Sequence, residues 1–315
     1  MKWNNWLVLM LAFTAHAAPP VPGTGQKLSP IGDDFEDPKW TFVHNLPKSS
    51  EEQDHNVRRP TGYSHSTRSQ FISEGASRII ESEHRGAPDT VERVETPAGG
   101  IPGSKGALKL QTLHSGVPGV PSGKQMQDDL MVNNTMNGQP QRFSARQNPG
   151  IVVRVFVPPF DQWKPESSSS FGFRIDANRE NVNERSRRGR QKEDKDRQYW
   201  PGFFMVQNYD QVNQRNVPQV LFRAGQNGFD VPGPELKQPG WYTLGMSFTG
   251  DGMVHYFMKQ GVGDLTAGDH QKSLMPYGNK NEFITQMFFN VTNADGKTWS
   301  APWVIDDPSM YLNSR

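Results

Sequence analysis

The chain has 315 residues, and its 34 Lys and Arg residues nearly balance its 33 Asp and Glu residues, which leaves a formal net charge of +1. This near-neutral charge argues against a dedicated nucleic-acid-binding protein, because such proteins normally carry a strong basic excess. The chain contains no cysteine, so disulfides, zinc–thiolate sites, iron–sulfur clusters and cysteine nucleophiles are excluded.

Segment 1–17 has the features of a secretory signal peptide. Lys2 supplies the positive charge, segment 6–13 is apolar, and residues 15–17 have the small-x-small pattern that precedes a cleavage site. The apolar run is far shorter than the roughly 20 residues that cross a bilayer, and no later stretch is long enough. We therefore expect a secreted or periplasmic protein without a membrane span. Since an exported protein without cysteine needs no oxidative folding, a bacterial source is expected.

Composition then divides the remaining chain. Segment 18–30 is rich in Pro and Gly and is predicted to be a linker, so a single folded domain is expected over 31–315. Segment 47–102 is polar and turn-rich, which predicts long loops with short strands. Segment 178–197 carries eight basic and five acidic residues, and such a mixed run predicts a solvated loop insertion between two strands. Alternatively, this run would form an electropositive lip over a cleft for an acidic polymer.

The second half of the chain contains a series of predicted β-strands. β-Branched and aromatic residues that alternate with polar ones, bounded by Gly, Pro and Asn, predict strands at 151–157, 171–176, 203–207, 219–223, 241–248, 253–258, 284–291 and 303–312. The turn 249–252 has the sequence Thr-Gly-Asp-Gly and predicts a hairpin between two of them. Helical periodicity is weak throughout. We therefore predict an all-β fold, an antiparallel β-sandwich of the jelly-roll type with long loops and little helix.

Four short motifs carry a family resemblance. They are the DDFED run at 33–37 followed by Trp40, SKGALKL at 104–110, GWYTL at 240–244 and WVIDD at 303–307. In order and placement they resemble the concanavalin A-like lectin/glucanase jelly roll, as found in exported bacterial proteins of carbohydrate metabolism. The opening and closing motifs are also similar to those of the extracellular MAM-type jelly roll. The resemblance spans residues 33–312.

The resemblance implies that the first and last strands pair and that a structural calcium lies beside them. The side chains of Glu36 and Asp306 would be ligands, together with a backbone carbonyl near Gly106 and, as a possible fourth, Asp34. Calcium prefers such hard oxygen ligands. The alternative is that these acids cap strand ends and pair with Lys or Arg.

Catalytic motifs of the superfamily are not matched. The glucanase pattern Glu-x-Asp-x-x-Glu, which places two carboxylates on one strand face, does not occur, and the signatures of jelly-roll alginate lyases are not matched convincingly. Whether the protein is an enzyme is left open by the sequence.

The residue types that a polysaccharide lyase needs are nevertheless present. A lyase neutralises a uronate carboxylate with Arg or an amide and removes the C5 proton with His or Tyr. The alternation of each strand places Arg154, Arg174, Arg223 and His255 on its polar side. Whether the side chains of Gln207 and Gln286 also point away from the core depends on which alternate residues of their strands face it. Tyr199 and Trp200 flank the charged insertion, where a flat ring can stack on a sugar. If these strands are neighbours on the concave sheet, the eight side chains line one groove. Otherwise the arginines pair with acids on a solvated face and His255 is a surface residue.

Three functions follow from these observations. The first is an exported, non-catalytic protein that binds a polysaccharide on its concave face, which accounts for the absent catalytic motifs. The second is a lyase that cleaves an acidic, uronate-containing glycan by β-elimination, with Arg154, Arg174, Arg223 and His255 as its catalytic set. The third is a structural or adhesive surface protein. Fold analogy alone does not choose among them.

Overall fold

A computed structural model describes residues 18–42, 54–55, 65–67, 88–113, 115, 128–136, 139–163, 171–179, 197–293 and 297–313. The predicted signal peptide and residues 180–196 of the charged insertion lie outside these residues. The described helical segments are 3₁₀ turns of three residues each: η2 (Ala145–Gln147), η3 (Phe160–Gln162), η5 (Gln226–Gly228), η6 (Ala267–Asp269) and η7 (Pro276–Gly278). No helix within the described ranges combines the length and apolar character needed to cross a bilayer.

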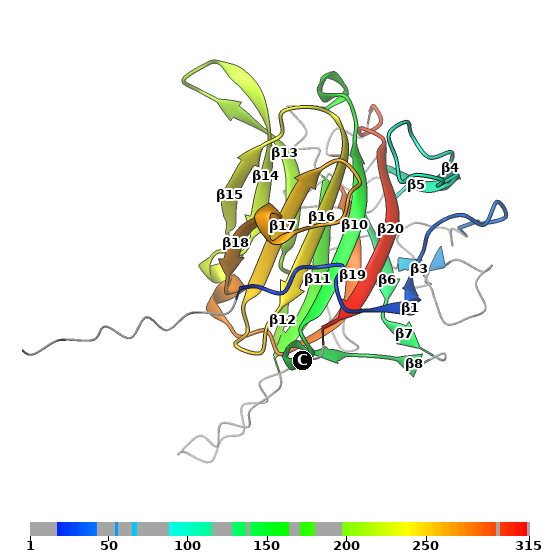
Figure 1. Cartoon of the computed structure of the whole chain (residues 1–315). Coiled ribbons are helices and arrows are strands. Elements are labelled where there is room, and N and C mark those ends of the chain that lie inside the picture. The colour runs from blue at the N-terminus through cyan, green and yellow to red at the C-terminus, as the bar shows by residue number, and fades with distance from the viewer. Residues whose placement is uncertain are drawn as a thin grey trace, which may run out of the picture.

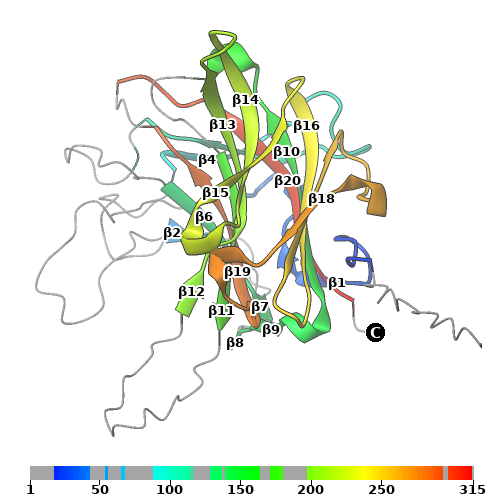
Figure 2. The same cartoon turned by 90° about the vertical axis from the view of Figure 1, so that its left-hand side faces the viewer.

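Two antiparallel sheets face each other and enclose the core (Figures 1 and 2). Sheet A has the strand order β18-β17-β16-β10-β20-β5-β4, with β1 beside β20. Its strands are β1 (Gln26–Gly32), β4 (Thr90–Val94), β5 (Ala107–Gln111), β10 (Pro149–Val157), β16 (Gly240–Phe248), β17 (Val254–Gln260), β18 (His270–Leu274) and β20 (Trp303–Leu312).

Sheet B has the order β15-β14-β13-β11-β19-β6-β3-β2, with β12 beside β11 and β9 beside β19. Its strands are β2 (Asp54–His55), β3 (His65–Thr67), β6 (Asp128–Asn133), β9 (Phe143–Ser144), β11 (Phe171–Arg179), β12 (Arg197–Tyr199), β13 (Gly202–Asp210), β14 (Arg215–Arg223), β15 (Asp230–Glu235) and β19 (Phe283–Val291). The short strands β7 (Thr135–Met136) and β8 (Gln139–Pro140) form a separate pair. The predicted all-β jelly-roll sandwich is therefore confirmed.

A column of stacked aromatic rings joins the two sheets through the core. In sheet B the ring centroids lie 6.2 Å apart for Phe203 and Phe173, 5.4 Å for Phe173 and Phe289, and 6.1 Å for Phe289 and Phe171. The last of these rings stacks on Trp303 of sheet A at 5.0 Å. All five side chains are buried. Each buries a large apolar area, so the column contributes much of the hydrophobic stabilisation between the sheets.

The opening and closing segments of the chain lie side by side, as the resemblance implied. Strand β1 pairs antiparallel with β20, and Gln26 lies opposite Leu312. Five residues of the predicted linker, 26–30, therefore belong to a strand, which corrects the linker boundary. Earlier in the same segment, Pro22 is buried because it packs over Gly150 and Gly245, where a Cβ atom would lie within 3.2 and 2.8 Å of it. The lack of side chains at these two glycines lets the chain lie flat on sheet A.

Replacing Phe289 with Ala should lower the free energy of unfolding by about 3–5 kcal/mol, because the substitution leaves a cavity in the middle of the aromatic column. Urea denaturation followed by tryptophan fluorescence measures the change. Tyr209→Ala is the matched control, since Tyr209 is 61% exposed and its loss should change stability by no more than about 0.5 kcal/mol. Equal effects of the two substitutions would contradict the assigned role of the column.

Candidate functional site

The outer face of sheet B carries a row of charged and aromatic side chains. Because Phe173 and Phe203 point into the core, the next residues along their strands, Arg174 and Phe204, point away from it. On β19, Phe288 lies directly opposite Arg174 and points the same way. This face contains several of the polar side chains that the sequence placed in a binding groove.

Arg174 is the buried centre of this row. Its Nε and Nη2 atoms each donate a hydrogen bond to the carbonyl oxygen of Trp200 at 3.2 Å. Its guanidinium lies 5.2 Å from the ring centroids of both Phe204 and Phe288, within cation–π distance. The residue is only 3% exposed. This arginine therefore fixes the loop before β13 onto the sheet, and its charge is held inside the protein.

Arg223, at the neighbouring edge of the sheet, is more accessible. Its guanidinium lies 4.8 Å from the Phe204 ring and bonds Asp230 on β15 through Nε at 2.5 Å and Nη2 at 3.2 Å. The side chains of Arg223 and Asp230 keep 27% and 30% exposure. Next to this pair, Phe229 is 72% exposed. A partly exposed charged pair and an exposed aromatic residue, adjacent in the chain to Asp230, are thus found at this edge of the sheet.

Tyr277 completes this edge in a strained conformation. Its φ of 60° lies in the left-handed region, which is costly for a residue with a large side chain. The backbone N–H of Tyr277 donates to the carbonyl of Gly225 at 3.0 Å, and its ring lies 5.3 Å from that of Tyr199. Gly228 has no side chain, and a Cβ there would lie 2.4 Å from the Tyr277 ring. The tyrosine ring therefore packs beside Tyr199 and the bare backbone of Gly228, next to Arg223, with which it interacts electrostatically.

Asp176 lies on the same face of β11 and is 5% exposed. Gln286 Nε2 donates to its Oδ2 at 3.2 Å, whereas Oδ1 has no hydrogen-bond partner within the part of the chain that the structure describes. Burial raises the pKa of Asp176 to about 6, although the nearby hydroxyl of Thr285, the hydrogen bond from Gln286 and the charge of Arg174 act in the opposite direction. This carboxylate is only partly satisfied by its surroundings.

Two of the predicted groove residues lie on the opposite side of the sandwich. Arg154 is on the outer face of sheet A, where it bonds Asp307 at 3.1 Å, Asp264 at 2.9 Å and the carbonyl of Val262 at 3.3 Å. It links β10 to β20 and to the loop after β17. The alternative in which this arginine pairs with acids is thus the observed one.

His255 is the second predicted groove residue that lies on sheet A. Its hydrogen bonds determine which ring nitrogen carries the proton. Its Nε2 lies 2.9 Å from Thr249 Oγ1, which donates to Asp251 at 2.5 Å, and its Nδ1 lies 2.7 Å from Ser273 Oγ. An ionised carboxylate only accepts, so the threonine hydroxyl must donate to it and accept from Nε2–H. In the neutral ring Nδ1 is then the acceptor for Ser273. Burial lowers the pKa of His255 to about 4, with the charge of Asp251 opposing and that of His270 adding to the shift.

The remaining predicted residues are divided between the core and the outer face. Gln207 points to the core side of β13, where its Nε2 donates to the Phe160 carbonyl at 3.3 Å. Tyr199 is 5% exposed, and its hydroxyl has no hydrogen-bond partner among the described residues. Trp200 is half-buried at the loop before β13, and Gln286 faces outward on β19.

The single groove expected from the sequence is therefore not formed. Arg174, Trp200, Arg223 and Gln286 belong to the outer face of sheet B and its edge, whereas Arg154 and His255 belong to sheet A. The reason is topological, because β10 and β17 both belong to sheet A and the aromatic core separates them from β11 and β14 in sheet B. The sequence analysis did not identify Phe204 as an outward-facing residue of this site. Two consecutive Phe residues, Phe203 and Phe204, obscure the alternation of the strand.

The residues of the expected calcium site do come together, on the outer face of sheet A. Glu36 accepts hydrogen bonds from the backbone N–H groups of Lys105 at 2.9 Å and Gly106 at 3.3 Å. The Ser104 hydroxyl lies 3.0 Å from Asp306 Oδ2 and 3.3 Å from the Gly106 carbonyl. Two carboxylates, one hydroxyl and one carbonyl therefore converge, and these oxygen donors fit a hard cation in type. Asp34 instead accepts from the N–H of Glu36 at 3.2 Å.

A positive charge already lies beside this cluster. Arg93 Nε donates to the Phe35 carbonyl at 2.6 Å, and its Nη2 donates to the Lys105 carbonyl at 3.2 Å. Within the described ranges no three His, Asp or Glu side chains gather as a metal site. A cation here would thus depend on Glu36 and Asp306 with backbone and hydroxyl oxygens as its other ligands.

No protein-family model matches the chain, and no curated protein matches its sequence. Several solved structures are similar. An alginate lyase from Pseudomonas aeruginosa is 12% identical, with a TM-score of 0.41, covering 71% of this chain and 86% of that one. A carbohydrate esterase of bacteriophage phi24B is 11% identical, with a TM-score of 0.40, covering 72% and 89%. CBM27-1 of Caldicellulosiruptor saccharolyticus, solved with mannohexaose, is 11% identical, with a TM-score of 0.30, covering 73% and 86%. These likenesses concern the fold alone.

The raised pKa of Asp176 predicts a pH-dependent contribution to stability. Because the folded-state pKa of about 6 lies above the ordinary aspartate value of 3.8, this group favours folding fully below pH 3.8, and the contribution is lost as the pH rises through 6. Asp176→Asn should therefore gain stability relative to wild type as the pH rises from 4 to 7. Urea unfolding of both proteins across this range measures the difference. A difference that is constant with pH would contradict the raised pKa.

Proposed function

We propose that the protein binds a polysaccharide, without cleaving it, at the edge of sheet B around Arg223. The observation that carries the proposal is the partly exposed ion pair of Arg223 and Asp230, together with Phe229, the residue before Asp230, whose aromatic side chain is 72% exposed. The resemblance of the sequence to the lectin/glucanase jelly roll supports the same class of ligand.

The chemistry of this edge suits a sugar. A sugar ring has an apolar C–H face that packs on an aromatic ring and a rim of hydroxyl groups that bond charged side chains. Phe229 offers the ring, and the guanidinium and carboxylate of Arg223 and Asp230 offer donors and acceptors. Tyr277 is pre-positioned by its backbone, so little side-chain entropy would be lost on binding.

The lyase alternative receives less support, because its proposed catalytic set is divided. Elimination needs the charge-neutralising group and the proton acceptor around one sugar ring. His255 and Arg154 lie on sheet A, and Arg174 and Arg223 lie on sheet B. The imidazole of His255 is also committed to Thr249 and Ser273.

The adhesive alternative requires a large exposed apolar patch. The exposed large hydrophobic residues of the described chain are instead distributed over separate elements. Tyr209 and Val212 lie at the turn between β13 and β14, Phe229 and Met275 lie beside η5 and η7, and Trp299 lies before β20.

We also propose that segment 1–17 directs export, so that the edge of sheet B around Arg223 meets glycans outside the cytoplasm.

Phe229→Ala should weaken polysaccharide binding about three- to tenfold, since stacking on an aromatic ring contributes of the order of 1 kcal/mol. A glycan array identifies the polymer, and affinity electrophoresis in gels that contain it measures binding. Tyr209→Ala removes a comparably exposed aromatic ring outside the site and should bind like wild type. Ultraviolet absorbance of the polymer solution should stay constant. Growing absorbance from unsaturated uronate ends would instead establish the lyase, and equal binding by all three proteins would refute the site.

We further propose that the cluster of Glu36, Ser104, Gly106 and Asp306 holds a structural calcium. When bound, calcium would neutralise the two carboxylates and join the segment after β1 to β20. At a calcium concentration 100 times its Kd, ligand linkage would raise the free energy of unfolding by about 2.7 kcal/mol.

Thermal unfolding in excess calcium and in excess EDTA tests this proposal. The melting temperature of wild type should be higher with calcium, and Asp306→Asn should abolish the difference. Glu235→Gln, which removes a carboxylate on sheet B, should keep it. Identical melting temperatures of wild type with calcium and with EDTA would contradict the proposal and leave Arg93 as the positive charge that balances the carboxylates of the cluster.

A further inference from the structure

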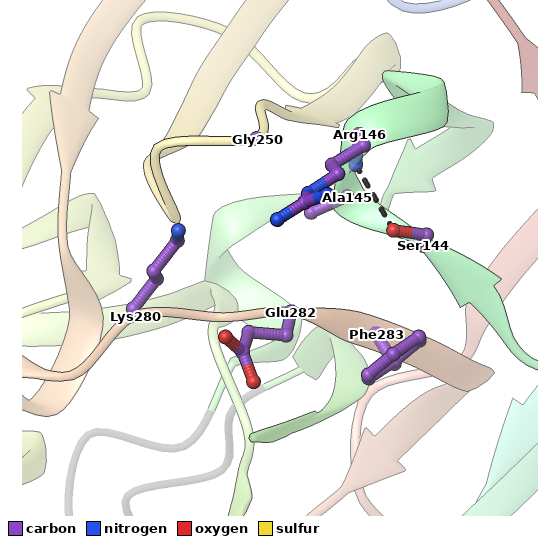
Figure 3. Close-up of a pocket in the computed structure, with 7 residues that line it drawn as sticks. All are labelled: Ser144, Ala145, Arg146, Gly250, Lys280, Glu282 and Phe283. Carbon is purple, nitrogen blue, oxygen red and sulfur yellow. Dashed lines mark hydrogen bonds between the residues drawn. The ribbon is translucent and has the colours of Figure 1, made fainter. Parts of the chain in front are cut away.

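A pocket lies at the end of the sandwich where β16 turns into β17, and none of the residues that line it belongs to the group around Arg223 (Figure 3). Its volume is about 230 Å³. Its walls come from η2, from the turn between β16 and β17, and from the segment that leads into β19. The lining residues are Ser144, Ala145, Arg146, Gly250, Lys280, Glu282 and Phe283.

Hydrogen bonds hold these three walls together. The N–H of Ala145 donates to the Glu282 carbonyl at 2.8 Å. Asn281 is 1% exposed, and its Nδ2 and backbone N–H donate to the Gly252 carbonyl at 3.2 and 3.4 Å. Within η2, Ser144 and Gln147 form a capping box that fixes the backbone at Arg146. The pocket is therefore pre-formed rather than assembled by a ligand.

Two glycines of the hairpin turn allow two cationic side chains to lie over it. A Cβ at Gly250 would lie 3.3 Å from Cγ of Arg146, and a Cβ at Gly252 would lie 2.2 Å from Cγ of Lys280. Gly252 also has a φ of +91°, which side chains rarely tolerate. The aliphatic stems of the arginine and the lysine thus pack on the bare backbone of the turn. This packing positions their charged groups at the pocket.

The two charges reach toward one space. Figure 3 shows the guanidinium of Arg146 and the ammonium of Lys280 extending from two different walls, with the carboxylate of Glu282 lower in the view, on the same segment as Lys280. Neither cation has an ion-pair partner among the described residues. A further guanidinium, that of Arg142, lies 4.1 Å from the ring centroid of Phe283 in the wall. The pocket therefore carries an excess of positive charge.

We propose that this pocket binds an oxyanion, the carboxylate or sulfate ester group of an acidic polysaccharide. Charged N–H donors from two walls can meet such a group with charge-assisted hydrogen bonds, and the Phe283 ring can contact the sugar carbon that carries it. The volume is below the roughly 300 Å³ at which pockets for drug-sized ligands begin, so it accommodates one substituted sugar unit. The inference does not depend on the site around Arg223.

Affinity electrophoresis of the full chain tests the proposal in gels that contain polygalacturonate, dextran sulfate or unmodified dextran. Wild type should be retarded in at least one anionic gel, and the gel that retards it identifies carboxylate or sulfate as the bound group. The double variant Arg146→Gln/Lys280→Gln should bind at least about tenfold more weakly, because it loses two charge-assisted contacts. Glu282→Gln should bind more tightly, since it removes the carboxylate of the lining.

Lys272→Gln is the matched control, because it lowers the net charge by one unit on β18 without touching the pocket, and it should be retarded like wild type. Equal retardation of wild type and the double variant, or no retardation of wild type in either anionic gel, would overturn the proposal. Phe229→Ala separates the two sites. Loss of binding in this variant alone would support the edge of sheet B and refute the pocket, and loss in the double variant alone would do the reverse.

Discussion

The stacking of aromatic rings between the two sheets is the interaction on which the rest of the structure depends. The column from Phe203 through Phe173, Phe289 and Phe171 to Trp303 fills the space between the two layers. Because a strand alternates its side chains, each ring committed to the core sends its neighbour outward. The column therefore decides which polar residues reach the outer faces and on which face they appear.

The three arginines of the predicted groove show how that placement separates similar residues. Arg154 and Arg174 are 7% and 3% exposed and hold loops onto sheet A and sheet B, respectively. Arg223 lies near the edge of its sheet and keeps part of its side chain in solvent while Asp230 orients it. Exposure, rather than residue type, distinguishes a structural arginine from one that can meet a ligand, since a buried charge must be satisfied within the protein.

The hairpin turn between β16 and β17 serves two neighbouring features. Thr249 and Asp251 point their side chains into the hydrogen-bond chain of His255 and so set the tautomer of that ring, while burial lowers its pKa. Gly250 and Gly252, which alternate with them, leave room for the stems of Arg146 and Lys280. One four-residue turn thereby organises a polar network on sheet A and a cationic pocket at the end of the sandwich.

The β-sandwich can be predicted from local sequence patterns, because strands with clear alternation and a Gly-rich hairpin turn depend on local preferences. The predicted segments 151–157, 241–248 and 303–312 correspond closely to β10, β16 and β20. Strands at the edges were missed for a physical reason. The strand β15 contains two prolines and a glycine, and β18 has no apolar alternation, yet an edge strand needs to pair on one side only.

Which polar residues share a site depends on contacts between segments that are distant in the sequence. The sequence placed Arg154, Arg174, Arg223 and His255 correctly on the polar sides of their strands, but strand parity does not tell which sheet a strand joins. That choice is made by long-range pairing, which put β10 and β17 in one layer and β11 and β14 in the other. The convergence of Glu36 with Asp306 was expected from the family resemblance, whereas the meeting of Arg146 and Lys280 over two turn glycines arises from packing between distant segments, which no local pattern encodes.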